Sequence, residues 1–153
     1  MDDIDRRILN VLQTDAGLAV AEIASRVGLS TTPCWRRIQN LEKSGVIRGR
    51  VAVLNRQAVN LGVTVIVRVR TSRHDIEWLE RFARAVEDID EIVEVYRMSG
   101  DIDYVLKVVV PDIAAYDAIY KRLIAAVPMT DVSSNFAMEE IKFATKLPLG
   151  YAH

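Results

Sequence analysis

One helical segment carries side chains that can contact a nucleic acid. Cys34, Ile38 and Leu41 recur at i, i+4 and i+7, which places them on the inward face of a helix that ends near Ser44. The outward face then holds threonine hydroxyls, an indole and an arginine fork, groups that contact base edges or phosphates in a major groove. The candidate set is Ser30, Thr31, Thr32, Trp35 and Arg36, with Arg37, Arg48 and Arg50 flanking the face and expected to meet phosphates.

The same pattern leaves alternatives open. A three-helix module that binds protein has similar spacing, and Trp35 can stack on the following segment or on a neighbouring subunit instead of a base. Cys34 lies on the inward face with no histidine nearby, so a buried small hydrophobe is expected rather than a nucleophile.

A second polar constellation lies at Gly100 to Tyr104. Gly100 supplies a backbone conformation that other residues resist, and two carboxylates and a phenol follow it. Carboxylates pair with an ammonium and turn amides bind a carboxylate, so the loop can hold a small zwitterion. From the residues alone, a polar hairpin that caps its own turn is the favoured alternative, since Asp and Gly usually serve that purpose.

Composition excludes several classes of protein. The 153 residues include one cysteine and two histidines, so neither a disulfide framework nor a His-based metal centre is expected, and no metal or other cofactor is predicted. No nucleophile, metal set or partner base accompanies Asp101 and Asp103, so no catalytic residue is assigned. The acidic start is no signal peptide and no apolar run is long enough to span a membrane, so a cytoplasmic protein is expected.

The first third of the chain reads as helical. Periodicity and breaker residues predict helices over residues 3–14, 20–27 and 31–44, with Gly28 in the tight turn and Ser30 as the N-cap of the third. This is the pattern of a helix-turn-helix. Residues 46–54 are expected to form a strand or wing.

From Gly62 the pattern alternates strand and helix. Strands are expected over 63–69, 92–98, 102–110 and 132–143, and helices over 75–86, with Leu79 inward, and 112–127. The order β-α-β-β-α-β is that of the ferredoxin-like unit. The prediction is an α+β protein: a winged helix-turn-helix domain at 1–61 with net charge +3, and a ferredoxin-like βαββαβ sandwich at 62–153 with net charge −4.

The apolar character of two strands favours an oligomer. The apolar runs at 63–69 and 105–110 are nearly continuous. A strand with one face exposed to solvent alternates apolar and polar residues instead. Two helices cover only one face of such a sheet, so a second copy is expected on the other, and a symmetric dimer suits a helix-turn-helix that reads paired half-sites.

Two motifs in order carry a family resemblance. The stretch from DIDRRILNVLQTDAG through VAEIASRVGLSTTPCWRRIQNLEKSGVI, and SGDIDYVLKVVVPDIAAY at 99–116, resemble the leucine-responsive/asparagine-regulator (Lrp/AsnC, feast/famine) transcription factors. TTPCWRR, RMSGDIDY and DVSSNFAMEEIK are similar to a branch that includes regulators of cysteine breakdown.

The resemblance implies an amino-acid effector, with cysteine as a candidate, a pocket between dimers, and dimers that assemble into a larger ring, often an octamer. The implied effector residues are Met98, Gly100, Asp101, Asp103 and Tyr104 from the motif, with Ser133, Ser134 and Phe136 matched by their place in the last strand. The sequence thus predicts an amino-acid-responsive transcriptional regulator that binds double-stranded DNA. The alternatives are an architectural DNA-binding protein without effector and an amino-acid sensor subunit that acts on proteins.

Overall fold

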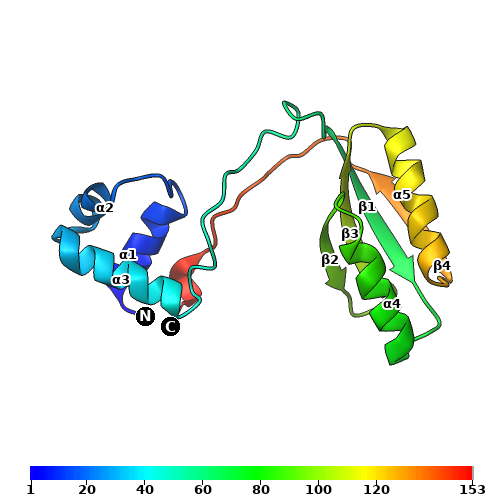
Figure 1. Cartoon of the computed structure of the whole chain (residues 1–153), viewed down its shortest axis with the longest axis horizontal. Coiled ribbons are helices and arrows are strands. Elements are labelled where there is room, and N and C mark those ends of the chain that lie inside the picture. The colour runs from blue at the N-terminus through cyan, green and yellow to red at the C-terminus, as the bar shows by residue number, and fades with distance from the viewer. Residues whose placement is uncertain (153) are drawn as a thin grey trace. The chain divides into compact units, whose positions relative to one another are not determined.

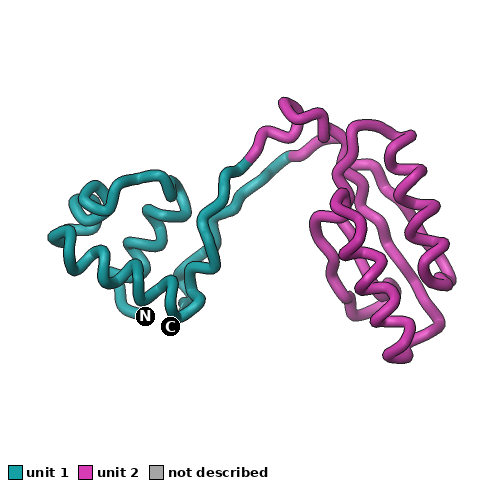
Figure 2. The backbone as a smooth tube through the Cα atoms, in the orientation of Figure 1, with its two compact units in different colours: residues 1–53, 141–153 teal, residues 54–140 magenta. Residues whose placement is uncertain are grey.

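The computed structural model describes residues 1–152, which divide into two compact units (Figure 2). Unit 1 comprises residues 1–53 and the chain from Ile141 onward, and unit 2 comprises Leu54–Glu140. The expected boundary after residue 61 assigned the whole C-terminal segment to the second domain. Instead, the Gln13 side chain accepts the Leu147 N–H at 2.6 Å and donates to the Leu147 carbonyl at 3.3 Å, and Leu149 packs against the core of unit 1.

Unit 1 is a three-helix module followed by the short 3-10 turn η1 (Leu149–Tyr151). Its helices are α1 (Asp3–Leu12), α2 (Val20–Val27) and α3 (Thr31–Lys43), so the predicted helices are confirmed, with α1 ending two residues earlier than expected (Figure 1). Ile8, Ile23 and Ile38, one from each helix, are fully buried together. The periodic apolar positions therefore make one core.

Residues 46–54 were expected to form a strand or wing, and no strand forms there. Residues 49–54 have no regular structure, and Val51 and Val53 are 85% and 61% exposed. Backbone groups of a strand need a partner strand, and no segment within residues 1–152 pairs with this one.

Unit 2 is a four-stranded antiparallel sheet in the order β2-β3-β1-β4, with two helices on one face (Figure 1). Its elements are β1 (Val63–Arg70), α4 (Ile76–Glu87), β2 (Ile92–Arg97), β3 (Tyr104–Val110), α5 (Ile113–Ala126) and β4 (Asp131–Phe136). This is the predicted ferredoxin-like βαββαβ arrangement. Trp78 and Phe82 of α4 stack with ring centroids 5.0 Å apart, and both belong to the core between the helices and the sheet.

Two details of unit 2 differ from expectation. The last strand ends at Phe136 rather than at residue 143, because Phe136 pairs with Val65 and β1 begins at Val63, which leaves little backbone to pair beyond that point. Leu79, expected inward, is 41% exposed, because Trp78 and Phe82 occupy the face of α4 toward the sheet. Among the described helices, none combines the length and apolarity that crossing a membrane requires.

Candidate functional site

Helix α3 is placed by the tight turn that follows α2. Gly28 has φ +71°, the left-handed conformation that a glycine adopts without strain, and the Leu29 N–H donates to the Ala24 carbonyl. Cys34, Ile38 and Leu41 are buried against α1 and α2 as expected. Burial raises the pKa of the Cys34 thiol, which agrees with a packing role.

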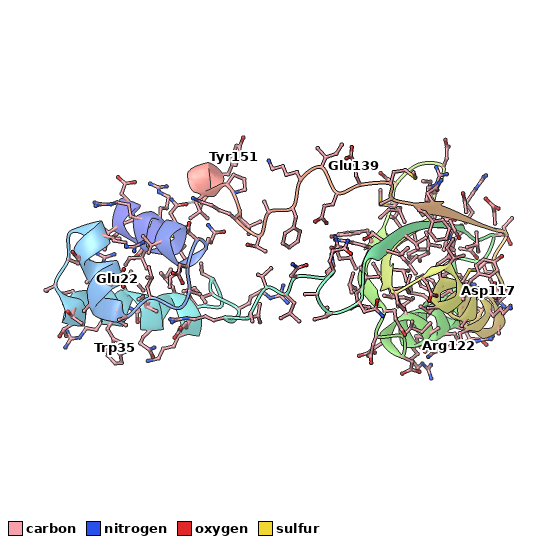
Figure 3. The ribbon with its side chains drawn as sticks, turned by 90° about the horizontal axis from the view of Figure 1, so that it is seen from above. Glu22, Trp35, Asp117, Arg122, Glu139 and Tyr151 are labelled. Atoms are coloured by element: carbon pink, nitrogen blue, oxygen red, sulfur yellow. The ribbon has the colours of Figure 1, made fainter. Side chains whose placement is uncertain are left out.

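The opposite face of α3 is exposed. Thr31, Thr32, Trp35 and Arg36 are all solvent-accessible, and Trp35 points away from the other helices of unit 1 (Figure 3). Trp35 is 50% exposed, an unusual environment for a side chain of its size. Ser30 is the N-cap by position, yet within residues 1–152 its hydroxyl makes no capping hydrogen bond. The face therefore presents hydroxyls, an indole and a guanidinium together.

The flanking arginines differ from one another. Arg48 is exposed, whereas Arg50 forms an ion pair with Glu42 at 2.9 Å. The Arg37 guanidinium lies against the start of α1, where it pairs with Asp2 at 2.6 Å and Asp5 at 2.8 Å. Arg37 was expected to meet phosphate; its Nη1 instead donates to two carboxylates within unit 1.

Unit 2 has a pocket on the sheet face opposite its helices. Its volume is about 220 Å³, and it is lined by Arg68, Arg70, Asp101, Ile102, Asp131 and Ser133. The arginines alternate along β1 with the buried Val67 and Val69, and the register sets Arg68 opposite Ser133 and Arg70 opposite Asp131. The hairpin loop contributes the other two residues.

The charges of this pocket suit a zwitterion. Two guanidinium groups can bind a carboxylate, and two carboxylates can pair with an ammonium. Arg68 donates to the Ser133 hydroxyl at 3.2 Å, which orients one guanidinium at the pocket wall. On the same face, Lys107 pairs with Glu94 at 2.9 Å. The hydrogen bond from Lys107 holds the pKa of Glu94 below its usual range, and a hydrogen bond from Tyr96 adds a smaller effect in the same direction.

Only Asp101 and Ser133 of the eight expected effector residues line this pocket. The Asp103 carboxylate instead accepts the Thr71 N–H at 2.8 Å, and Tyr104 is 7% exposed within the aromatic core beside Trp78 and Phe82. Both residues thus have structural contacts. Gly100 has φ +106° and forms the turn, and Met98 is exposed outside the pocket lining.

Ser134 and Phe136 lie on the helix side of the sheet. The Ser134 hydroxyl is hydrogen-bonded to the Tyr116 hydroxyl of α5, and Phe136 packs edge-on against the Tyr116 ring. Burial raises the pKa of Tyr116, and the bond to Ser134 opposes that rise. Neighbouring residues of a strand face opposite ways, so Ser133 and Ser134 cannot line one pocket.

Sequence reasoning missed four lining residues: Arg68, Ile102, Arg70 and Asp131. The signal was present in VTVIVRVR, where two arginines alternate with valines. The valines make the run nearly continuous in apolar character, while Arg68 and Arg70 form a polar face between them.

The two units match two kinds of domain model. Residues 1–48 match the winged helix-turn-helix DNA-binding domain, and residues 64–147 match the Lrp/AsnC ligand binding domain. A helix-turn-helix unit combined with a ferredoxin-like ligand-binding unit defines the class. The chain belongs to the Lrp/AsnC family, as the sequence motifs predicted.

Relatives and solved structures agree with this assignment. The glutamate uptake regulatory protein of Zymomonas mobilis is 48% identical over 97% of this chain and 91% of its own length. The crystal structure of an AsnC family transcriptional regulator from Agrobacterium tumefaciens has a TM-score of 0.97 and 62% identity over 100% of both chains. A transcriptional regulator from Neisseria meningitidis, solved as a complex with L-Met, has a TM-score of 0.93 and 34% identity over 98% of this chain and 97% of that one. Relatives of this chain are DNA-binding transcriptional regulators.

Proposed function

We propose that this chain is an amino-acid-responsive transcriptional regulator that binds double-stranded DNA through α3. The observation that carries the proposal is the exposed face of α3, where Thr31, Thr32, Trp35 and Arg36 lie together after a helix-turn-helix turn. In such a motif the N-terminal residues of the second helix contact base edges. Arg48, and Arg50 when released from Glu42, would contact phosphates beside that helix.

The effector in this proposal is a free amino acid that occupies the pocket of unit 2. Arg68 and Arg70 would bind its α-carboxylate, and Asp101 and Asp131 its ammonium group. The L-Met complex of the Neisseria relative supports this class of ligand. Cysteine is the amino acid to test first because of the motif resemblance, with methionine and leucine as comparisons.

For the effector to change DNA binding, the protein must have two states that differ in assembly or domain geometry. The effector and the DNA must each bind one of these states more tightly than the other. Within unit 2, both helices pack on the other face of the sheet. The face that carries the pocket is therefore open within that unit, which supports a homodimer, and the family resemblance extends this to an octamer. An effector that binds one assembly better than another changes DNA affinity by that difference in binding free energy.

The first experiment is fluorescence anisotropy on a labelled duplex from upstream of the chain's own gene, with a shuffled duplex as competitor. Cysteine, methionine and leucine are each added in turn. We expect sequence-specific binding that shifts with one amino acid. Binding that ignores both sequence and amino acid supports an architectural DNA-binding protein, and absence of DNA binding with retained ligand binding supports a sensor subunit.

The pocket is tested separately by calorimetric titration of the amino acid that acts in that experiment. Arg70→Gln and Asp131→Asn each remove one charged hydrogen-bonding partner, so affinity should fall by about 10- to 100-fold. Arg84→Gln is the matched control, because Arg84 lies on α4 and not in the pocket lining. Equal losses in all three variants would refute the assignment of the pocket.

A further inference from the structure

Two neighbouring arginines on α3 have opposite environments. Arg36 is exposed, and among residues 1–152 no carboxylate pairs with it. Arg37 donates from Nη1 to Asp2 Oδ2 at 2.6 Å and to Asp5 Oδ1 at 2.8 Å. Successive residues of a helix point about 100° apart, so one arginine faces solvent while the next faces α1.

The two carboxylates that hold Arg37 also build the start of α1. Asp2 Oδ1 accepts the Asp5 N–H at 2.8 Å, and Asp5 Oδ2 accepts the Asp2 N–H at 3.2 Å, a reciprocal capping box. Each of the four carboxylate oxygens therefore has a partner, one backbone and one Arg37 contact per side chain. The capping box thus holds both carboxylates in the orientation in which they meet Arg37.

This geometry keeps the network charged. The Asp5 N–H, followed by the hydrogen bond from Arg37, lowers the pKa of Asp2, and the two carboxylates raise the pKa of Arg37. Arg37 thus ties the middle of α3 to the first turn of α1. These contacts lie at the edge of unit 1, next along α3 to Ile38, which is buried in its core.

We propose that Arg37 is a positioning residue: through Asp2 and Asp5 it sets the orientation of α3, so that Arg36 and the threonines reach DNA. The inference rests on the proposed DNA-binding function and adds to it a residue that acts without touching DNA. In a helix-turn-helix the angle of the second helix decides which side chains reach base edges, so a loosened α3 weakens DNA binding.

The proposal and a direct phosphate contact predict opposite signs for one variant. Asp2→Asn with Asp5→Asn removes two negative charges near α3, while asparagine remains a good N-cap. If Arg37 contacts phosphate, this double variant binds DNA more tightly, because repulsion falls and Arg37 is freed. If Arg37 positions α3, the double variant binds more weakly.

The experiment measures anisotropy with the labelled upstream duplex over a range of salt concentrations. We expect the double variant and Arg37→Gln each to bind about fivefold more weakly, the size of a typical partly exposed ion-pair effect. Adding Arg37→Gln to the double variant should cause no further loss, since both changes remove the same interaction. Arg37→Lys, with a single-point donor, should recover part of the affinity.

Salt dependence provides the matched control. Arg36→Gln should reduce the slope of log affinity against log salt by about 0.9, the value for one lost phosphate contact, whereas Arg37→Gln should leave that slope unchanged. Circular dichroism melting of each variant confirms that unit 1 is folded at the assay temperature.

Tighter DNA binding by the double variant, or a slope change for Arg37→Gln equal to that for Arg36→Gln, would overturn the positioning role alone. Failure of the unmodified chain to bind DNA would overturn the proposed function and, with it, this role. Exchange of the Asp5 amide hydrogen with solvent, followed by NMR, tests directly whether Arg37 holds the start of α1. The exchange rate should rise in Arg37→Gln and not in Arg36→Gln.

Discussion

Asp101 and Asp103 are two residues apart and should respond oppositely to substitution. Asp103 links the hairpin loop to the end of β1: its carboxylate accepts the Thr71 N–H at 2.8 Å, while its backbone N–H donates to the Val69 carbonyl at 3.0 Å. Asp101 lines the pocket. Asp103→Ala should therefore destabilise unit 2, and Asp101→Ala should impair ligand binding instead.

The magnitude follows from the group left without a partner. Thr71 is 7% exposed, and Asp103→Ala removes a charged acceptor from its N–H, which costs about 1–3 kcal/mol. A domain of this size loses about 4–8 °C in Tm per kcal/mol, so we expect a fall of about 10 °C. A surface substitution such as Asp101→Ala changes stability by about 0.5 kcal/mol or less. Asp103→Asn, whose amide oxygen can still accept the N–H, should fall between the two.

Thermal unfolding of unit 2 can be followed by the fluorescence of Trp78, which is buried in its core. The second tryptophan, Trp35, belongs to unit 1 and is replaced by phenylalanine in every variant to leave one reporter. Equal Tm values for Asp101→Ala and Asp103→Ala would refute the division of roles. So would loss of amino-acid binding in Asp103→Asn with unchanged Tm.

Three further outcomes are expected. Gly28→Ala should destabilise unit 1 by about 1–2 kcal/mol. The cost is backbone strain, because φ is +71° and the added Cβ would meet only Arg7 Nη2, at 4.0 Å. A urea titration that shows no loss of stability would contradict this. Cys34 should resist iodoacetamide at neutral pH and react on unfolding, since it is buried and burial raises its thiol pKa; mass spectrometry that finds rapid native labelling would disprove it. The pKa of Glu94 is lowered in the folded state by Lys107, so its contribution to stability is present above the ordinary carboxyl range and lost as pH falls through the folded pKa. Glu94→Gln should therefore flatten the acid side of the stability profile from urea titrations, and an unchanged profile would count against the pair.

Local signals explain why the helix-turn-helix could be predicted. Gly28 and the apolar spacing of Cys34, Ile38 and Leu41 act within a few residues, and helices α2 and α3 begin and end close to where these signals place them. The end of β4 was not predictable in the same way. It depends on where β1 begins, and that partner lies far away in the sequence.

The site residues show the same difference between local signals and contacts with distant parts of the chain. The GDIDY motif identified the loop near the pocket, yet the structure separates Asp101, which lines it, from Asp103 and Tyr104, which hold the loop and the core. Arg68 and Arg70 became visible as site residues only when the register placed them opposite Ser133 and Asp131.

The sequence by itself determined the family, the order of the helices and strands, and the exposed face of α3, because these follow from local propensity, periodicity and motifs. Only the tertiary structure decided which charges are free. Arg36 and Arg37 are adjacent and identical in type, but Arg37 meets two carboxylates from the start of α1. A side chain's role depends on the groups that folding brings within hydrogen-bond distance, and those groups lie on other elements of the fold.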